Sequence, residues 1–143
     1  NFFLEILEIL LENGADINLV HEELQGYTPF LFSIEIGDLD VFKLFCKYNP
    51  NINQKNISFM GPLEIALVYN HFELFKKLTI KYSFKEYDTL EKVLMLLYYT
   101  YGINKDYNLS YDKIKNYLWD FILKTNLNIF EKERLYFILK RSC

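Results

Sequence analysis

The first half of the chain repeats itself with a period of 33 residues, and this repeat limits the possible folds more than any other feature. Residues 26–53 align with residues 59–83 at that offset. The matched positions are Pro29 with Pro62, Phe30 with Leu63, Ser33 with Ala66, Gly37 with Asn70, Leu39 with Phe72, Phe42 with Phe75, Lys43 with Lys76 and Phe45 with Leu78. One apolar position does not match, because Leu44 falls on Lys77. Such a period indicates similar units stacked together, since one unit cannot bury its apolar face alone.

A second match extends the repeat toward the first residue. Residues 14–18, GADIN, align with residues 49–53, NPNIN, at an offset of 35. The two extra residues are expected in the polar connection at residues 21–25, where an insertion costs little. The sequence therefore contains three units in register, of which the first is partial.

Residues at fixed places in each unit indicate a pair of helices. Pro29 and Pro62 suit the first turn of a helix, where the N–H that proline lacks would have no partner. Thr28 can cap the first of these helices with its side-chain oxygen. Gly37 and Asn70 stand where the first helix of a unit ends, since both residue types accept a left-handed backbone. Apolar residues then recur at helical spacing and predict the second helix.

These units resemble the ankyrin repeat. The segment LEILEILLENGADIN at residues 4–18 is similar to its second helix and closing loop, and GYTPF with the later Gly37 is similar to the start G-x-T-P-L-H-x-A-A-x-x-G. In the next unit Gly61-Pro62-Leu63 stands for T-P-L and Asn70-His71 for Gly-His. The resemblance covers residues 1–83. It implies an all-α fold, an ankyrin-type α-solenoid of helix–turn–helix repeats with a helical C-terminal cap.

The resemblance also sets the expected organisation. Residues 1–83 are expected to hold a partial first unit, a second unit at 23–55 and a third at 56–83. Residues 84–143 carry neither T-P-L-H nor G-A-D and are expected to form a degenerate repeat and a capping helix in the same continuous domain. The helices are predicted near 2–12, 28–36, 39–48, 62–69, 72–82, 88–101, 111–125 and 129–140. Finger-like loops are predicted near 14–27 and 49–61, and a longer connection at 103–109.

Two departures from the ankyrin pattern stand at the contact between units. Leu31 and Glu64 replace the usual His, so the hydrogen bond of that His to the Thr position is expected to be lost. The pairs Ser33-Ile34 and Ala66-Leu67 replace two small alanines. The bulkier residues are expected to alter the helix spacing.

Composition excludes several classes of function. The net charge of −3 gives no reason to expect a nucleic-acid partner, which would favour a basic stripe. No apolar run reaches the ~18 residues that span a membrane, and the opening NFFLEILEILL is interrupted by Glu5, Glu8 and Glu12. The two cysteines, Cys46 and Cys143, indicate no disulfide framework and favour a reduced, cytoplasmic protein. The 14 Lys against 2 Arg suggest an AT-rich genome of a parasite, symbiont or virus, so the compartment could be the host cytosol.

No pattern for catalysis or cofactor binding is present in the sequence. Neither His21 nor His71 has a second ligand at metal-binding spacing, and ankyrin repeats commonly carry a structural His where His71 stands. Cys46 has no nearby His and is expected in the core rather than as a nucleophile. The five glycines form no phosphate-binding loop. We therefore expect no enzyme activity, no cofactor and no metal.

The ankyrin resemblance implies a protein–protein interaction module that binds another protein through finger loops and the concave inner-helix face. One alternative is an adaptor whose C-terminal helices link a target to a ubiquitin ligase. The Leu-Pro pair that usually opens such a segment is missing after residue 83. Another alternative is a regulatory fragment of a larger enzyme or channel. The full-length gene sequence would separate these hypotheses.

The resemblance also implies which residues face the partner. In ankyrin repeats the positions around the Thr-Pro pair and the two before the central Gly vary and face partners. In this chain they are Leu24, Gln25, Tyr27, Glu35 and Ile36 in one unit, and Ile57, Ser58, Met60, Val68 and Tyr69 in the next. Seven of these ten are apolar or aromatic, and an exposed patch of that kind usually marks an interface. The tyrosines are the expected anchors. Alternatively, the C-terminal segment or a second copy of the chain covers them.

Overall fold

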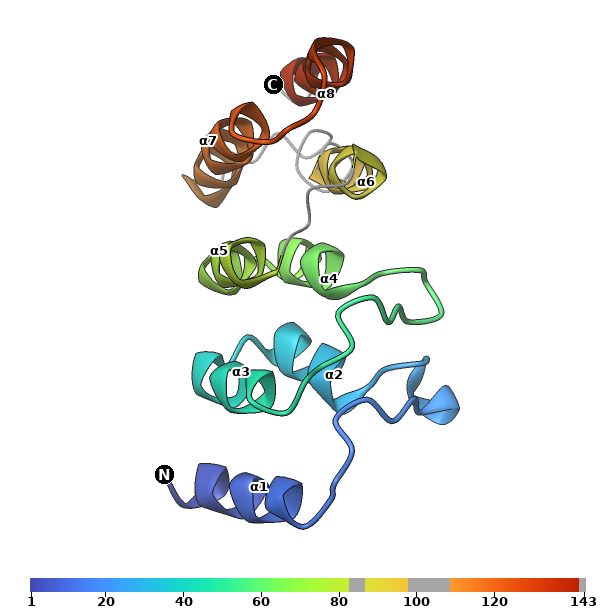
Figure 1. Ribbon diagram of the computed structural model, residues 1–143, viewed down its shortest axis with the longest axis vertical. Helices are drawn as coiled ribbons and strands as arrows, with labels where there is room; N and C mark the ends of the chain where they lie inside the picture. The colour runs from blue at the N-terminus through green and yellow to red at the C-terminus, as the bar shows by residue number, and fades with distance from the viewer. Residues whose placement is uncertain (83–86, 98–108, 142–143) are drawn as a thin grey trace. The chain divides into compact units, whose positions relative to one another are not determined.

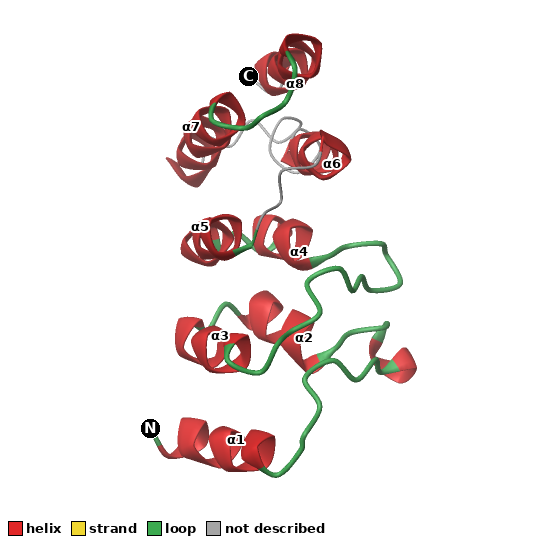
Figure 2. Cartoon of the chain, viewed as in Figure 1, coloured by secondary structure: helices red, strands yellow, loops and turns green. Residues whose placement is uncertain are grey.

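The computed structural model describes residues 1–82, 87–97 and 109–141. Within these ranges the chain forms eight α-helices, one short 3₁₀ helix and no strand (Figure 1, Figure 2). The helices are α1 (Phe2–Glu12), η1 (Glu22–Leu24), α2 (Pro29–Ile36), α3 (Leu39–Cys46), α4 (Pro62–Val68), α5 (Phe72–Lys81), α6 (Tyr87–Leu97), α7 (Leu109–Leu123) and α8 (Ile129–Arg141). The described part of the chain is therefore all-α, as predicted.

The described helix boundaries lie within two residues of the boundaries predicted from the sequence. Residues 98–101 of the helix predicted near 88–101, and residues 103–108 of the predicted connection, lie outside the described residues. The sequence did not predict η1, which lies inside the first expected loop. The helical pattern is thus set locally, while the turn inside the loop is not.

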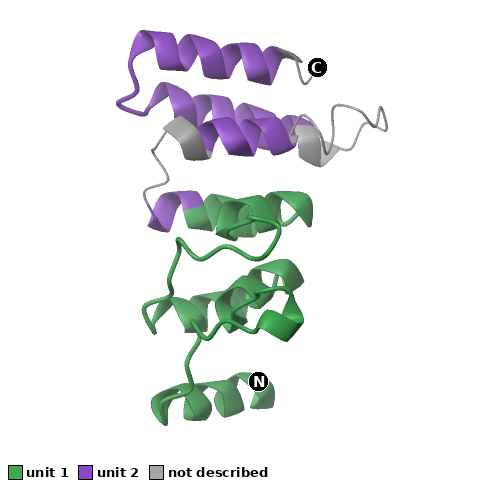
Figure 3. Cartoon of the chain, turned by 90° about the vertical axis from the view of Figure 1, so that its right-hand side faces the viewer, with its two compact units in different colours: residues 1–78 green, residues 79–143 purple. Residues whose placement is uncertain are grey.

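The chain divides into two compact units, residues 1–78 and residues 79–143, which Figure 3 colours separately. The boundary falls inside α5, a few residues before the predicted end of the repeats at residue 83. In the first unit α2 packs against α3 and α4, and α1 packs against α3. One continuous domain over the whole chain stays a prediction.

Side chains and backbone together define where the helices of the first unit begin and end. Thr28 Oγ1 accepts a hydrogen bond from the Leu31 N–H at 3.1 Å, directly before Pro29. Asp38 Oδ1 accepts from the N–H of Asp40 at 2.9 Å and of Val41 at 3.2 Å. These caps satisfy N–H groups that a helix end would otherwise leave without partners.

The repeat is also visible in the backbone, because residues with positive φ recur at equivalent positions. The pairs are Gly14 (94°) with Asn49 (53°), Gly26 (72°) with Phe59 (59°), and Gly37 (79°) with Asn70 (59°). Gln25 has a φ of 57° and no counterpart of this kind. At the end of α4 the N–H groups of Asn70 and His71 bond to carbonyls of the last turn, which is the reason for the left-handed residue.

The core of the first unit lies between the two layers of helices. Its largest fully buried side chains are Phe30, Leu31, Ile34, Leu63, Ile65, Leu67, Leu74, Phe75 and Leu78. The rings of Phe30 and Phe42 stack with centroids 6.1 Å apart, which joins α2 to α3. Each such side chain stabilises the fold by about 1.5–3 kcal/mol.

Glu64 replaces the histidine of the ankyrin pattern and is buried at the start of α4. Its carboxylate accepts a hydrogen bond from the Gly61 N–H at 3.1 Å. Gly61 occupies the position of Thr28 in the preceding unit. The sequence predicts that the hydrogen bond between the His position and the Thr position is lost. In this unit the Glu64 carboxylate and the Gly61 N–H form a hydrogen bond between the same two positions.

The second unit contains α6, α7 and α8, and α8 packs against both of the others. Its buried side chains include Leu90, Val93, Leu94, Ile114, Leu118, Ile122, Leu135 and Leu139. The rings of Trp119 and Tyr136 lie 4.9 Å apart between α7 and α8. This unit therefore has an apolar core of its own.

Candidate partner-binding site

A closed loop at residues 21–27 forms one side of the candidate site. The His21 N–H donates to the Tyr27 carbonyl at 3.0 Å, and the Gly26 N–H donates to the His21 carbonyl at 2.9 Å. Gln25 and Gly26 both have positive φ, which lets the chain turn back on itself. These bonds present Leu24 and the other residues of η1 in a fixed conformation.

A second loop, at residues 56–60, holds the first in place. Asn56 Oδ1 accepts from the Ser58 N–H at 2.9 Å and from the Met60 N–H at 3.0 Å. The Ile57 N–H then donates to the Gln25 carbonyl at 3.0 Å. Both loops project from the same side of the first unit (Figure 1). Two neighbouring repeats therefore support one surface.

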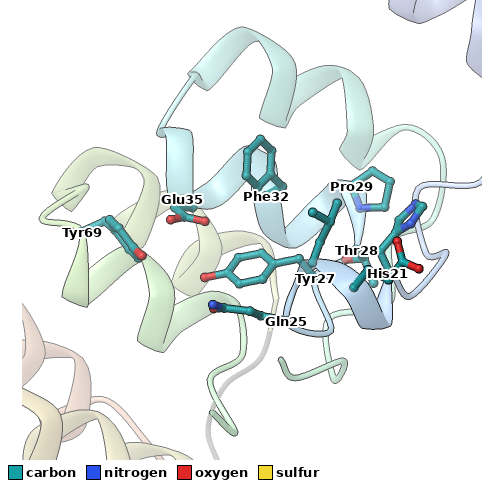
Figure 4. A pocket seen from close by; sticks show the side chains of 10 residues that line it. His21, Gln25, Tyr27, Thr28, Pro29, Phe32, Glu35 and Tyr69 are labelled. Carbon is teal, nitrogen blue, oxygen red and sulfur yellow. The ribbon is translucent and has the colours of Figure 1, made fainter. Parts of the chain in front are cut away.

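A pocket of about 550 Å³ lies where the first loop meets α2 and the end of α4. Its lining combines aromatic and aliphatic side chains with a few polar groups, as Figure 4 shows. The lining residues are His21, Glu23, Leu24, Gln25, Tyr27, Thr28, Pro29, Phe32, Glu35 and Tyr69. All of them belong to the first compact unit. This mixture is typical of a binding pocket.

Two tyrosines and one carboxylate form the polar cluster of the pocket. The interaction of the Tyr69 hydroxyl with the Glu35 side chain raises the pKa of Tyr69 to about 12; burial and the neighbouring Tyr27 act in the same direction. Burial raises the pKa of Tyr27 above its usual 10.0, although an interaction with the Asn56 side chain opposes the shift. In Figure 4 the Tyr27 hydroxyl points toward Tyr69. Both phenols are therefore neutral near pH 7 and able to donate.

Five of the ten residues predicted to face a partner meet in this pocket. They are Leu24, Gln25, Tyr27, Glu35 and Tyr69. The two sequence repeats contribute to it together, because Tyr69 comes from α4's end and the others from the preceding unit.

The other five predicted residues do not line the pocket. Ile36, Ile57 and Ser58 are exposed, while Met60 and Val68 are half-buried. Whether all ten face one partner stays a prediction, of which the pocket includes five residues. The ankyrin pattern assigns them by position in the repeat, whereas the pocket depends on where each side chain points.

Tyr27 is not the exposed anchor that the sequence suggests, because its exposed fraction is only 8%. Its ring meets the edge of Phe32 in a T-shaped contact with centroids 6.2 Å apart. Its hydroxyl end interacts with the side chain of Asn56, which lowers the pKa of Tyr27 against the effect of burial. Tyr27 is therefore a wall of the pocket, and its removal would disturb the loops as well as any bound partner.

Five lining residues were not predicted: His21, Glu23, Thr28, Pro29 and Phe32. Phe32 is the most exposed aromatic among them, at 52%. A signal for it was available, because it precedes Glu35 by three residues and Ile36 by four, and such spacing places side chains on one face of a helix. His21 and Glu23 line the pocket only because the loop closes, which no periodicity predicts.

Two other apolar surfaces are present in the described part of the chain, and the first shares Pro29 and Phe32 with the larger pocket. A smaller hollow of about 260 Å³ between α1, α2 and α3 is lined in part by Phe3, Leu7 and Ile36. On α8, Phe130 and Phe137 are largely exposed. The hollow has one carboxylate, that of Asp38, in its lining, whereas the larger pocket has two carboxylates, Glu23 and Glu35, and two tyrosines.

The described residues contain no group of three or more His, Cys, Asp or Glu placed to hold a metal ion. His71 instead contacts the backbone of Glu35, with its Nε2 2.7 Å from the carbonyl oxygen. Cys46 is half-buried at the end of α3. Among the described helices, none is both long enough and apolar enough to cross a membrane.

Comparison with known proteins gives two results. The model of a family described as ankyrin repeats matches residues 1–89 in three copies. A putative ankyrin repeat protein of Acanthamoeba polyphaga mimivirus is 35% identical to this chain over 71 residues. That match covers 50% of this chain but only 9% of the viral protein. The three copies correspond in number to the three units of the internal repeat.

Proposed function

The chain belongs to the ankyrin-repeat family, whose repeats are generally protein–protein interaction modules, and from this premise we propose that it binds a partner protein through its first unit. The contact surface is the pocket at residues 21–35 and Tyr69 together with the loop tips beside it. The partner is another protein, of which an exposed segment enters the pocket. The protein contributes binding and no chemistry of its own.

The observation that carries this proposal is the exposure of apolar side chains around the pocket. Leu24 is 61% exposed, Phe32 is 52% exposed and Tyr69 is 42% exposed. They come from a loop, a helix and a helix end, yet they line one cavity. Apolar surface that gathers around a cavity is a common feature of interfaces, because a partner removes it from water.

A photo-crosslinking amino acid in place of Leu24 tests the proposal in an extract of the native cell. We expect it to capture a defined protein, because this position stands at the edge of the pocket. The same amino acid in place of Ile9 is the control, since Ile9 is similarly exposed, at 57%, and lines none of the pockets described above. Equal yields of the same captured proteins at both positions would contradict the proposal.

The captured protein then allows a measurement of affinity. Phe32→Ala should weaken binding by roughly 1–3 kcal/mol, the range usual for an aromatic residue at the centre of an interface. Phe2→Ala is the matched control, because Phe2 is an exposed aromatic residue on α1 and lines none of these pockets. A loss of equal size in both variants would show that the pocket is not the contact surface.

A second candidate function is the adaptor, in which the second unit binds another protein. It is favoured by the separate core of residues 79–143 and by the exposed Phe130 and Phe137 on α8. A crosslinker in place of Phe130 should then capture a different protein from the one captured at Leu24. Capture of one and the same protein at both positions would favour the simple module. A regulatory fragment of a larger protein stays an alternative prediction.

A further inference from the structure

We propose that the pocket recognises a positively charged side chain, a lysine or an arginine, in an exposed segment of the partner. This inference rests on the proposed function and adds the chemistry of recognition to it. Three properties of the pocket support it: its aromatic walls, its two carboxylates and the lack of lysine and arginine among its lining residues.

Aromatic rings form walls of the pocket on more than one side. The rings of Tyr27 and Phe32 stand at 85° to each other, with centroids 6.2 Å apart. Tyr69 lines the cavity from the end of α4, and Figure 4 places Glu35 near it. A cation within about 6 Å of a ring centroid is attracted to the ring face, and removal of water strengthens the attraction.

The charge of the lining is negative. Glu23 comes from η1 and Glu35 from α2, and none of the ten lining residues is a lysine or an arginine. Neither carboxylate forms an ion pair with another residue that the structure describes. Residues 1–42 contain no lysine or arginine at all. A positive side chain would therefore complement charges that this part of the chain leaves without a counter-ion.

Glu35 is held in position for such a contact. His71 Nε2 lies 2.7 Å from the Glu35 backbone carbonyl oxygen, and Tyr69 stands beside the Glu35 side chain in Figure 4. A carboxylate has about four acceptor sites, so it can still accept from an ammonium or a guanidinium group. Such charge-assisted bonds are stronger than bonds between neutral groups. Carboxylate, phenols and rings together thus suit a long cationic side chain with an apolar stem.

Small probes test the proposal without a known partner. N-acetyl-arginine amide and N-acetyl-lysine amide are titrated into the full 143-residue chain, and the aromatic NMR signals of Phe32 and Tyr69 are followed. The neutral controls are the citrulline and norleucine compounds, which have similar size and no charge. We expect at least one cationic probe to bind about tenfold more tightly than its neutral control, because only the cation gains the ring and carboxylate contacts. The two cationic arms decide between lysine and arginine.

Charge-neutralising variants locate the effect. Glu35→Gln and Glu23→Gln should each reduce the affinity of the preferred cationic probe, by about threefold or more, and added salt should reduce it as well. Glu22→Gln is the matched control, since Glu22 is also exposed in η1 but does not line the pocket. A thermal unfolding curve of each variant separates loss of binding from loss of fold, and Glu23→Gln keeps the test decisive if Glu35→Gln unfolds the chain.

The proposal is overturned if neither cation binds, if the neutral compounds bind equally well, or if Glu22→Gln weakens binding as much as the two pocket variants do. These outcomes leave the protein-binding proposal standing, because crosslinking at Leu24 measures it independently. Conversely, the cationic probes could bind in the pocket while no protein is captured at Leu24. That result would support the recognition of a cationic side chain and contradict the proposal that the pocket binds a partner protein.

Discussion

The imidazole of His71 donates a hydrogen bond from Nε2 to the backbone carbonyl oxygen of Glu35, across 2.7 Å and 36 positions of sequence. A carbonyl oxygen can only accept, so this nitrogen carries the proton. The bond satisfies a carbonyl in the last turn of α2, which the helix itself leaves without a partner. It thereby joins two successive repeats and fixes the residue whose carboxylate enters the pocket.

Removal of this imidazole should destabilise the first unit. We expect His71→Ala to lower the free energy of unfolding by about 1–3 kcal/mol, because a part-buried carbonyl loses its partner. His21→Ala should change it by less than about 0.5 kcal/mol, since no hydrogen bond caps η1 through the His21 side chain. Urea unfolding followed by circular dichroism measures both. Equal stability of His71→Ala and the unsubstituted chain would show that the bond contributes nothing.

Gly37 lies directly beneath the same imidazole ring. A Cβ added at Gly37 would stand 2.4 Å from His71 Cε1, and the φ of +79° is strained for any residue with a Cβ. Gly37→Ala should therefore destabilise the chain by more than the ~1 kcal/mol that the strain alone costs. Gly14→Ala is the matched control, because its φ is +94° while nothing lies within 4 Å of the added Cβ.

The excess cost at Gly37 should depend on His71. In the double variant Gly37→Ala/His71→Ala the steric overlap is absent, so the two substitutions should cost less together than the sum of their separate costs. Unfolding free energies of the two single variants and the double variant give this coupling. Strict additivity would mean that the ring moves aside freely and that Gly37 is required for its backbone conformation alone.

The sequence predicts these repeats well because their signals are local. Pro29 begins α2, Gly37 ends it, and the spacing of apolar residues between them is that of a helix. Each of these effects acts within a turn or two of the chain, so a single sequence contains it. Departures from the ankyrin pattern are harder to interpret. The role of Glu64 at the start of α4 becomes clear only from the hydrogen bond that its carboxylate accepts from the Gly61 N–H.

The pocket could be predicted only in part. The ankyrin pattern indicates Leu24, Glu35 and Tyr69 as variable positions, but it does not state that their side chains converge. The convergence depends on the hydrogen bond from the Ile57 N–H to the Gln25 carbonyl and on the hydrogen bonds that close the loop at residues 21–27. Such contacts join residues about 30 positions apart, and their geometry depends on side-chain direction. For the same reason the burial of Tyr27 was not predictable from its place in the repeat.

Asn18 offers a test of the connection between neighbouring loops. Its Oδ1 accepts from the Asn51 N–H at 2.7 Å, and its Nδ2 donates to the Asn49 carbonyl at 3.3 Å. Asn18→Asp keeps the acceptor and loses the donor, whereas Asn18→Ala loses both. We expect the free energy of unfolding to be highest with Asn18, lower in Asn18→Asp and lowest in Asn18→Ala. The difference between the unsubstituted chain and Asn18→Ala should be about 1–2 kcal/mol, measured by urea unfolding. An Asn18→Ala variant as stable as the unsubstituted chain would show that this bridge is not needed.

The raised pKa values in the pocket make stability sensitive to high pH. The pKa of Tyr69 is about 12 in the folded chain against 10.0 for an ordinary tyrosine, and that of Tyr27 is raised too. Below pH 10 both phenols are protonated in the folded and unfolded states, so their contribution is fully present. Between pH 10 and about 12 the unfolded chain has already released protons that the folded chain retains. Stability should therefore fall as pH rises through this interval.

Tyr69→Phe isolates the effect of one phenol among the 12 tyrosines of the chain. The difference in phenolate absorbance between the unsubstituted chain and this variant should titrate near pH 12 rather than near pH 10. Because the interaction with Glu35 is the largest cause of the raised pKa, Glu35→Gln should move this midpoint toward 10. The decline in unfolding free energy above pH 10 should also be shallower in Tyr69→Phe. A difference titration centred near 10 in the folded chain would mean that Glu35 does not hold the phenol, and the charge arrangement inferred for the pocket would be wrong with it.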